Sequence, residues 1–271
     1  MNPLSRNNVT VTGNPAAART IIFINGLGTD QSCWNQITPA FAGDYRLVCF
    51  DNTGSLPSTQ PYFLEHQLRH LNIKGYAADL LEICTALELD GARTTLVGHS
   101  MGGMAGLLAS VERPAQFERI VLIGASPRYA NTDGYSGGFS VDDINSVYKA
   151  VRLDYTEWSL GLAAAAMGNP DRPMLAARFA ESIARIPPEL MLTILCSLLQ
   201  TDQRAELAKV RVPALLVQSQ EDFFVPLAVA EYMHANIPGS RLTLIDAKGH
   251  LPHISDPDKV VEVIKGFVGG A

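Results

Sequence analysis

The chain has 271 residues, of which 47% are hydrophobic and 18% are charged. This composition is typical of a folded globular chain with a sizeable core, and the length fits a single α/β domain that carries an insertion. The formal net charge of −6 argues against a nucleic-acid partner. The sequence also has no run of basic residues of the kind that binds anionic lipid.

Strands and helices are expected to alternate along most of the chain. Short apolar runs give the strands, and longer stretches of helix-forming residues separate them. This order predicts an α/β fold with a mainly parallel, twisted sheet and helices on both faces. The strands are expected near residues 8–12, 20–25, 46–50, 94–97, 119–123, 214–219 and 241–245. The helices are expected near residues 33–41, 73–88, 101–111, 226–236 and 257–267.

The alternation stops between residue 126 and about residue 208. This stretch contains no strand-like run, and prolines at 170, 173, 187 and 188 divide it into helical segments. We therefore expect residues 1–125 and 209–271 to form the core, and residues 126–208 to form a helical cap inserted above it. Its four helices are predicted at residues 141–153, 157–167, 174–186 and 189–199.

The sequence predicts a cytoplasmic protein without membrane contact or cofactor. No apolar stretch approaches the ~20 residues of a membrane span, and the first residues lack the apolar core of a signal peptide. Four widely spaced cysteines form no Cys-x-x-Cys or Cys/His pattern, so we expect reduced thiols and no metal site. No Gly-x-Gly-x-x-Gly phosphate loop is present.

Residues 98–102 read Gly-His-Ser-Met-Gly and lie between a predicted strand and a predicted helix. A sharp turn between a strand and a helix strains the serine and exposes its hydroxyl, which is how α/β enzymes present a nucleophile. Gly98 and Gly102 are needed where the chain doubles back, because Cβ atoms would collide there. Ser100 is therefore the candidate nucleophile.

A serine hydroxyl needs a base, which in this motif's chain order follows both the serine and an acid. His250 lies just beyond the predicted strand 241–245, at the edge of the sheet where sites gather in open α/β folds. His253, three residues later, is the competing candidate. We expect His99 to be a structural hydrogen-bonding residue. The remaining histidines, His66, His70 and His234, are expected on a solvated surface.

The acid is expected after the preceding strand, 214–219. Glu221 and Asp222 both follow that strand closely, and Pro226 is placed to open the next helix. A triad acid orients the imidazole and stabilises the imidazolium that forms during the reaction. One of the two carboxylates should point inward and the other toward water, and Asp222 is our candidate.

An oxyanion hole requires backbone N–H groups aimed at the developing negative charge. One donor is expected from Met101, the residue after the candidate nucleophile, and the other from the loop after an early central strand. Gly26-Leu27-Gly28 follows the predicted strand 20–25, and its glycines allow the backbone close to a ligand. Leu27 is therefore the expected second donor; the alternative is that the glycines only form a turn.

Several further stretches match a known family. They lie at residues 4–9, 26–34, 98–100, 109–114, 124–129, 137–139, 222–226 and 249–253. With them, nearly the whole chain resembles the α/β-hydrolase fold family, and within it the group of the bacterial stress-response regulator RsbQ and the plant strigolactone and karrikin receptors. Ser-Pro-Arg-Tyr at 126–129 and Gly-Gly-Phe at 137–139 are specific to this group. The resemblance implies a triad of Ser100, Asp222 and His250, with Leu27 and Met101 as oxyanion donors.

The chain departs from the family pattern in two places that concern the site. Asn25 stands where many hydrolases have histidine. The plant receptors follow the nucleophile with Val-Ser-Ala, whereas this chain has Met101-Gly102-Gly103, as in ordinary esterases. The triad is intact, but perception of plant hormones does not carry over.

Apolar residues of the predicted cap recur at three- and four-residue steps, which most often means packing of helix on helix. One side of a cap faces the catalytic serine, however. Trp158 and Leu162 match positions that line the ligand pocket in the resembled family. Phe139, Leu190 and Phe223 are further candidates for the same pocket.

These features together predict a cofactor-independent serine hydrolase that acts on a small, largely apolar ester or lactone. The alternative is a signalling protein that binds or slowly hydrolyses a ligand in order to regulate a partner. In the resembled bacterial protein that partner is a phosphatase with a sensor domain. A receptor with an intact triad has the sequence of an enzyme, so both hypotheses stay open at this point.

Overall fold

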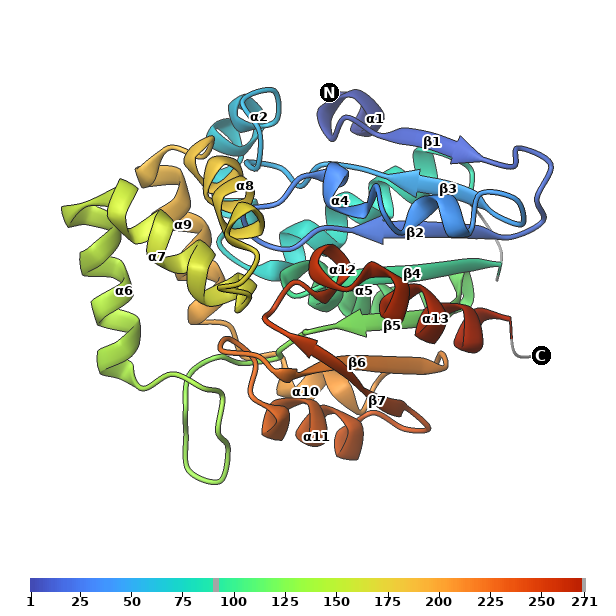
Figure 1. Cartoon of the computed structure of the whole chain (residues 1–271). Coiled ribbons are helices and arrows are strands. Elements are labelled where there is room, and N and C mark those ends of the chain that lie inside the picture. The colour runs from blue at the N-terminus through green and yellow to red at the C-terminus, as the bar shows by residue number, and fades with distance from the viewer. Residues whose placement is uncertain (90–92, 270–271) are drawn as a thin grey trace.

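The computed structural model describes residues 1–89 and 93–269. Within these residues, seven strands form one sheet in the order β1-β3-β2-β4-β5-β6-β7 (Figure 1). Strand β1 is antiparallel to β3, and all the other neighbours are parallel. The predicted α/β-hydrolase architecture is therefore confirmed. The strands are β1 (Thr10–Gly13), β2 (Thr20–Ile24), β3 (Arg46–Cys49), β4 (Thr94–His99), β5 (Phe117–Ile123), β6 (Ala214–Glu221) and β7 (Arg241–Lys248).

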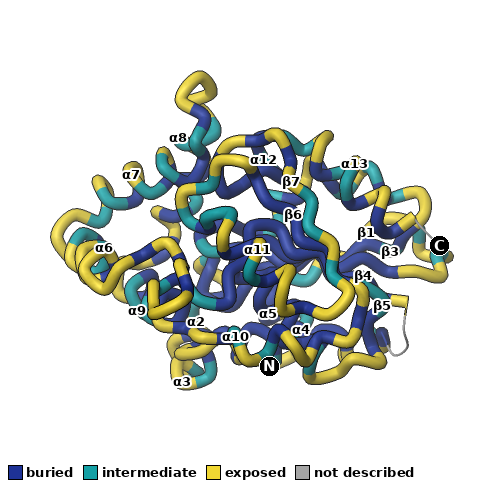
Figure 2. Tube along the Cα trace, turned by 90° about the horizontal axis from the view of Figure 1, so that it is seen from below, coloured by how far each residue is buried: buried dark blue, intermediate teal, exposed yellow. Residues whose placement is uncertain are grey.

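Helices cover both faces of the sheet because side chains of a strand point alternately to its two sides. In β2, Ile22 and Ile24 face one apolar cluster, with α4 (Ile73–Ala86) and α5 (Met101–Glu112). Ile21 and Phe23 face the other, with α13 (Pro257–Val268). Figure 2 shows buried tube in the middle of the molecule, where the inner strands β2, β4 and β5 lie. The shorter helices are α1 (Pro3–Arg6), α2 (Gln60–Glu65), α3 (Gln67–His70), α10 (Arg204–Leu207), α11 (Leu227–Asn236) and α12 (Pro252–Ser255), with a 3-10 turn at Pro114–Gln116.

The helix predicted at residues 33–41 is wrong. The chain instead forms two short 3-10 helices, η1 (Gln31–Trp34) and η2 (Thr38–Ala40). Pro39 lies inside the predicted span, where it lacks an N–H donor and its ring would clash with the carbonyl one turn earlier. Trp34 still turns into the core and is fully buried.

Four longer helices lie between β5 and β6 in the chain, beyond the edge at which the parallel strands end (Figure 1). They are α6 (Val141–Leu153), α7 (Tyr155–Met167), α8 (Pro173–Ala184) and α9 (Pro188–Leu199). The His250 amide donates to the carbonyl of Ala166 in α7 at 2.6 Å, which attaches these helices to the end of β7. The division of the chain into core and cap at residues 126–208 remains a prediction.

No single helix among the described residues is long and apolar enough to cross a membrane. Helices α8 and α9 meet the length and composition criteria only when taken together, and they are bent by 103° relative to each other.

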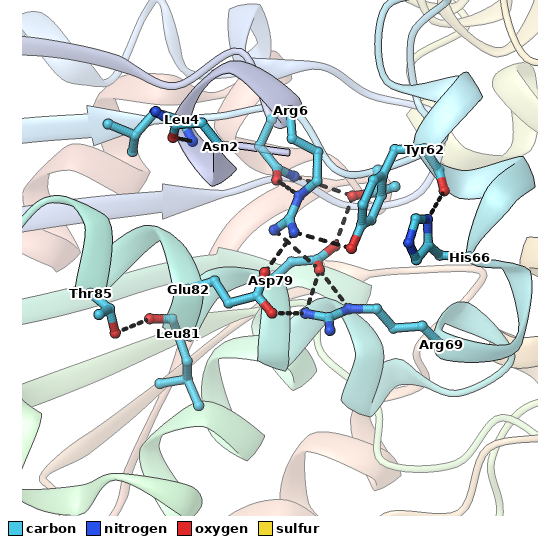
Figure 3. Close-up of polar contacts among 12 residues, drawn as sticks. Asn2, Leu4, Arg6, Tyr62, His66, Arg69, Asp79, Leu81, Glu82 and Thr85 are labelled. Atoms are coloured by element: carbon cyan, nitrogen blue, oxygen red, sulfur yellow. Dashed lines mark hydrogen bonds and ion pairs between the residues drawn. The ribbon is translucent and has the colours of Figure 1, made fainter.

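A buried ion-pair cluster attaches the N-terminal segment and α3 to α4 (Figure 3). Asp79 of α4 lies 3.2 Å from an Arg6 guanidinium nitrogen and 2.8 Å from one of Arg69. Its other oxygen contacts His70 at 2.8 Å. Burial raises the pKa of Asp79, but the hydrogen bond and charge of His70 and the charge of Arg6 outweigh it and lower the pKa.

The expected solvated position of His70 is wrong, because this side chain is fully buried against Asp79. The cluster is also connected to the end of β2. Thr53 donates to Asp79 at 2.7 Å, and its neighbour Asn52 donates to the carbonyl of Asn25 at 2.8 Å. The buried charges therefore help to hold the backbone just before the expected oxyanion loop.

Candidate active site

The turn around Ser100 has the strained geometry that its sequence predicts. Ser100 has φ 52°, a left-handed value that L-residues rarely adopt. A Cβ on Gly98 would lie 2.6 Å from the Cα of Gly103, and one on Gly102 would lie 2.3 Å from the carbonyl oxygen of Asn25. Only glycine fits at these two positions, and the strain lifts the Ser100 hydroxyl away from the sheet.

The structure brings Ser100, His250 and Asp222 into one hydrogen-bonded chain. The Ser100 Oγ lies 2.9 Å from Nε2 of His250, and Nδ1 of His250 lies 2.8 Å from Oδ2 of Asp222. Since a carboxylate only accepts, Nδ1 carries the proton and Nε2 is free to accept from the serine. This is the arrangement that general-base activation of a serine requires.

The Asp222 carboxylate accepts hydrogen bonds from other groups besides His250. Its Oδ1 accepts from the amides of Phe224 at 2.9 Å and Val225 at 3.1 Å, and its Oδ2 accepts from Gln218 at 3.2 Å. Burial raises the pKa of Asp222, but the charge of His250 and these backbone donors lower it further, so the carboxyl stays ionised. Glu221 points outward, 68% exposed, and pairs with Lys248. The expected inward and outward carboxylates are thus found.

The two expected oxyanion donors belong to segments that adjoin Ser100. Met101 is the first residue of α5, and Leu27 lines the same cavity as Ser100. Among the described residues, neither backbone amide donates to another protein group. A Cβ on Gly26 would lie 2.4 Å from Nδ1 of His99, so only glycine lets this loop come so close. Both amides are available to a ligand oxygen.

A cavity of about 70 Å³ opens onto the Ser100 hydroxyl. Three of the five predicted pocket residues, Phe139, Trp158 and Leu162, line it. The lining is almost entirely apolar, which favours a ligand with little charge. The other lining residues are Leu27, His99, Tyr129, Val147, Ala166, Phe179, Leu195, Leu198, Leu199, Phe224, His250 and Leu251.

Leu190 and Phe223 do not line the cavity. Leu190 is buried in the core near the start of α9, whereas Leu198 of the same helix lies at the cavity, about 12 Å further along. Phe223 is 64% exposed. The turn that Asp222 fixes directs the neighbouring Phe224 inward instead, with its ring 5.4 Å from that of His250.

Tyr129 contributes a polar group that the sequence prediction did not include. Its hydroxyl lies 3.5 Å from the Ser100 Oγ, and burial raises its pKa. The Ser-Pro-Arg-Tyr stretch was the available signal for it. Arg128, in the same stretch, turns away and pairs with Asp202 at 2.8 Å. Thus the cavity gains a neutral donor and no cation from this segment.

His99 and His253 form a column of buried rings behind His250. The His99 ring lies 4.8 Å from His250 and 4.4 Å from His253, which in turn lies 4.6 Å from the Trp34 ring. His99 Nε2 donates to the backbone carbonyl of His250 at 2.8 Å, a structural hydrogen bond of the expected kind. His253 makes no hydrogen bond in the described structure and does not contact the triad acid.

We predict that this column makes the protein sensitive to acid. Burial lowers the pKa of His99 well below its usual value, and burial with the nearby His250 lowers that of His253 to about 3. The unfolded chain binds these protons at pH ~6.5, so stability is fully present above that pH and is lost as the pH falls toward 3. One such histidine removes about 2 kcal/mol of unfolding free energy by pH 5.

Chemical denaturation between pH 4 and 8 measures this effect. His253→Phe keeps an aromatic ring and removes the titration, so its unfolding free energy should depend less on pH than that of the wild type. His234 is exposed, and His234→Phe is the matched control with an unchanged pH dependence. Identical curves for wild type and His253→Phe would show that the buried imidazole does not cause the acid sensitivity.

The described residues contain no group of three or more His, Cys, Asp or Glu side chains that could hold a metal ion.

The parallel sheet, the strained serine after β4 and the histidine after β7 define an α/β hydrolase. The sequence profile described as the alpha/beta hydrolase family matches residues 21–263, and the chain belongs to this family. Within the family it is similar to the karrikin and strigolactone receptor group. A karrikin insensitive 2 receptor from Petunia hybrida is 34% identical over 257 residues, which are 94% of this chain and 92% of that protein.

Two further relatives support this placement. A strigolactone esterase of Arabidopsis thaliana is 33% identical over 265 residues, 97% of each chain. Among solved structures, a hydrolase from Oleispira antarctica superimposes with a TM-score of 0.92 at 28% identity, covering 100% of this chain and 97% of the other. The resemblance predicted from the sequence motifs is confirmed.

Proposed function

We propose that this protein is a cofactor-independent serine hydrolase that acts on small, largely apolar esters or lactones. The observation that carries the proposal is the chain of hydrogen bonds from Asp222 through His250 to the Ser100 hydroxyl, placed at the wall of an apolar cavity. The esterase named among the relatives supports the reaction class.

In the first half-reaction, His250 Nε2 takes the proton of Ser100 while Oγ attacks the carbonyl carbon. The Leu27 and Met101 amides hold the resulting oxyanion. His250 then gives its proton to the leaving alcohol oxygen as the carbon–oxygen bond breaks, which leaves an acyl group on Ser100. In a lactone the alcohol remains attached to that acyl group.

In the second half-reaction, His250 takes a proton from a water molecule that attacks the acyl carbonyl. The oxyanion forms again between the same two amides, and its collapse breaks the bond to Ser100 Oγ, which recovers the proton from His250. Asp222 remains ionised and stabilises the imidazolium in both steps. We assign residues 126–208 the role of a cap, because α6–α9 supply most of the apolar wall above the serine.

The apolar wall predicts a strong preference for uncharged substrates. Arg128 turns away, so a carboxylate on the substrate would be buried in the cavity without a cation, whereas burying apolar surface gains about 25 cal/mol per Å². We expect kcat/KM for a neutral ester to exceed that for its carboxylate-bearing analogue by at least about 100-fold. Trp158→Ala should raise KM more than it lowers kcat, because Trp158 forms a wall and takes no part in the chemistry.

Specificity constants for one matched ester pair test this preference, with Phe223→Ala as the control for Trp158→Ala. Phe223 is exposed and outside the cavity, so its loss should leave KM near the wild-type value. A higher specificity constant for the carboxylate-bearing ester would contradict the proposed substrate class.

The similarity to receptors favours a second candidate function. The protein would bind a small apolar ester or lactone in the same cavity, hydrolyse it slowly or once, and regulate a signalling partner such as a sensor phosphatase. Steady-state turnover separates the two functions. Many turnovers per minute on simple esters support the enzyme, whereas a single burst of product followed by a stable acyl-enzyme supports the receptor.

A further inference from the structure

The catalytic cavity shares one wall with a second hollow on the molecular surface. This outer cleft, of about 320 Å³, lies between α8 and the segment 29–36 that follows the oxyanion loop. Leu175 and Ile254 contribute apolar side chains to its lining, and Asp30, Ser32 and Arg178 contribute polar ones. Among the described residues, Phe179 alone lines both the cavity and the cleft.

The Phe179 ring packs against the oxyanion loop. A Cβ on Gly28 would lie 3.3 Å from the Phe179 Cε2 and 2.9 Å from the Ile183 Cγ1. The backbone at position 28 also has φ 74°, a left-handed value that favours glycine. The missing side chain at Gly28 makes room for the ring, and the ring lines the cavity together with Leu27.

An ion pair holds α8 against the loop across this cleft. Arg185, just after α8, lies 2.8 Å from Oδ2 of Asp30, and Oδ1 of Asp30 accepts from the Ser32 amide at 2.9 Å. Burial raises the pKa of Asp30, but the hydrogen bonds from Ser32 and the charge of Arg185 lower it overall, so the pair is charged at neutral pH. The pair keeps α8, and with it Phe179, close to the oxyanion loop.

We propose that the outer cleft is a second subsite for an unbranched, uncharged substrate chain, and that Phe179 is the gate that limits its length. The inference rests on the proposed hydrolase function. The cavity of about 70 Å³ has room only for a compact group, and the Phe179 ring lies between it and a cleft of about 320 Å³. Leu175 and Ile254 would contact the chain, and its end would reach water beside the exposed Ser32 and Arg178.

Phe179→Ala tests the gate by joining the two spaces. Initial rates are measured on p-nitrophenyl esters from acetate to decanoate, and on acetates of unbranched alcohols of the same lengths. The wild-type kcat/KM should stop increasing at a certain chain length. Beyond that length, kcat/KM of the variant should rise about fourfold for each methylene, as expected for burying one CH₂ group. A rise in either series supports the gate and identifies which side of the ester enters the cleft.

Phe139→Ala is the matched control, because Phe139 lines the cavity without touching the cleft. Its kcat/KM should not rise with each methylene beyond the wild-type length limit. Phe179→Leu replaces the alanine variant if that variant does not fold, and should show a smaller gain. Unchanged length profiles in a folded Phe179 variant overturn the proposal.

The ion pair between Asp30 and Arg185 is tested with two arginine variants. Arg185→Gln should also raise kcat/KM for long chains, by a smaller factor than Phe179→Ala does, because it frees α8 from the loop. Arg178→Gln removes the same charge from the same cleft but breaks no ion pair of the described structure, so it should leave the length limit in place. Equal profiles for the two arginine variants contradict the role of the Asp30–Arg185 pair.

Failure of the gate and failure of the proposed function give different results. If the wild type hydrolyses no ester, the hydrolase function fails, and the gate is then tested by the rate at which alkyl fluorophosphonates of increasing chain length label Ser100. If the wild type is active and neither Phe179 variant changes the length profile, only the gate fails.

Discussion

Ser100→Ala should lower ester hydrolysis by a factor of about 10⁴ to 10⁶ and abolish labelling by a fluorophosphonate probe. The alanine keeps the Cβ and the backbone at φ 52°, so the strain of the turn is retained. Only the hydroxyl and its 2.9 Å hydrogen bond to His250 are lost. The free energy of unfolding should therefore change by less than about 1.5 kcal/mol.

Ser219→Ala is the matched control for this substitution. Ser219 is buried in β6, and its hydroxyl makes no hydrogen bond in the described structure. This variant should be labelled at the wild-type rate. If Ser100→Ala is labelled as fast as the wild type, Ser100 is not the nucleophile and the proposed mechanism fails.

The hydrogen-bonded grouping of Ser100, Asp222 and His250 could be predicted from the sequence because each residue has a local signal. Ser100, Asp222 and His250 each follow the end of a strand, and β4, β6 and β7 belong to one sheet in which their carboxyl ends share an edge. An apolar run followed by a polar residue is visible in a single sequence. His253 lies three residues further along the chain, inside α12 and not directly after β7.

The cavity wall was harder to predict because it depends on side-chain direction. Phe223 and Phe224 are adjacent and chemically identical, and the hydrogen bonds that Asp222 accepts decide which of them turns inward. Sequence periodicity places Leu190 on an apolar face of α9 but does not show which end of the helix overlies Ser100. Tyr129 and Phe179 reach the site through contacts between distant segments.

The same limit applies to the buried charges. His70 lies in a polar stretch of the sequence, and its burial depends on Asp79, with which it pairs inside the structure. Local pattern alone predicts a solvated histidine there. The continuous helix expected at 33–41 failed for a local reason, since Pro39 was visible in the sequence and argues against it.

His250→Ala should reduce hydrolysis about as much as Ser100→Ala, and the double variant should lose little more than either single variant. Members of a triad act as a unit, so their effects do not add. Asp222→Asn should lower kcat by about 10⁴, because an amide at this position no longer holds the imidazole in the tautomer with a proton on Nδ1. Single-turnover rates of ester cleavage measure all four variants without interference from product release.

Glu221→Gln and His253→Ala are the controls that decide between neighbouring candidates. Glu221 makes the same acid-to-amide change one residue away, but its side chain is 68% exposed and pairs with Lys248, so kcat should stay within about twofold of the wild type. His253→Ala opens a gap beside Trp34 and should cost about 2–5 kcal/mol of stability, with chemistry retained in the folded protein. If His253→Ala is the inactive variant and His250→Ala is active, the base is misassigned. The 2.9 Å contact between His250 and Ser100 would then have no catalytic role.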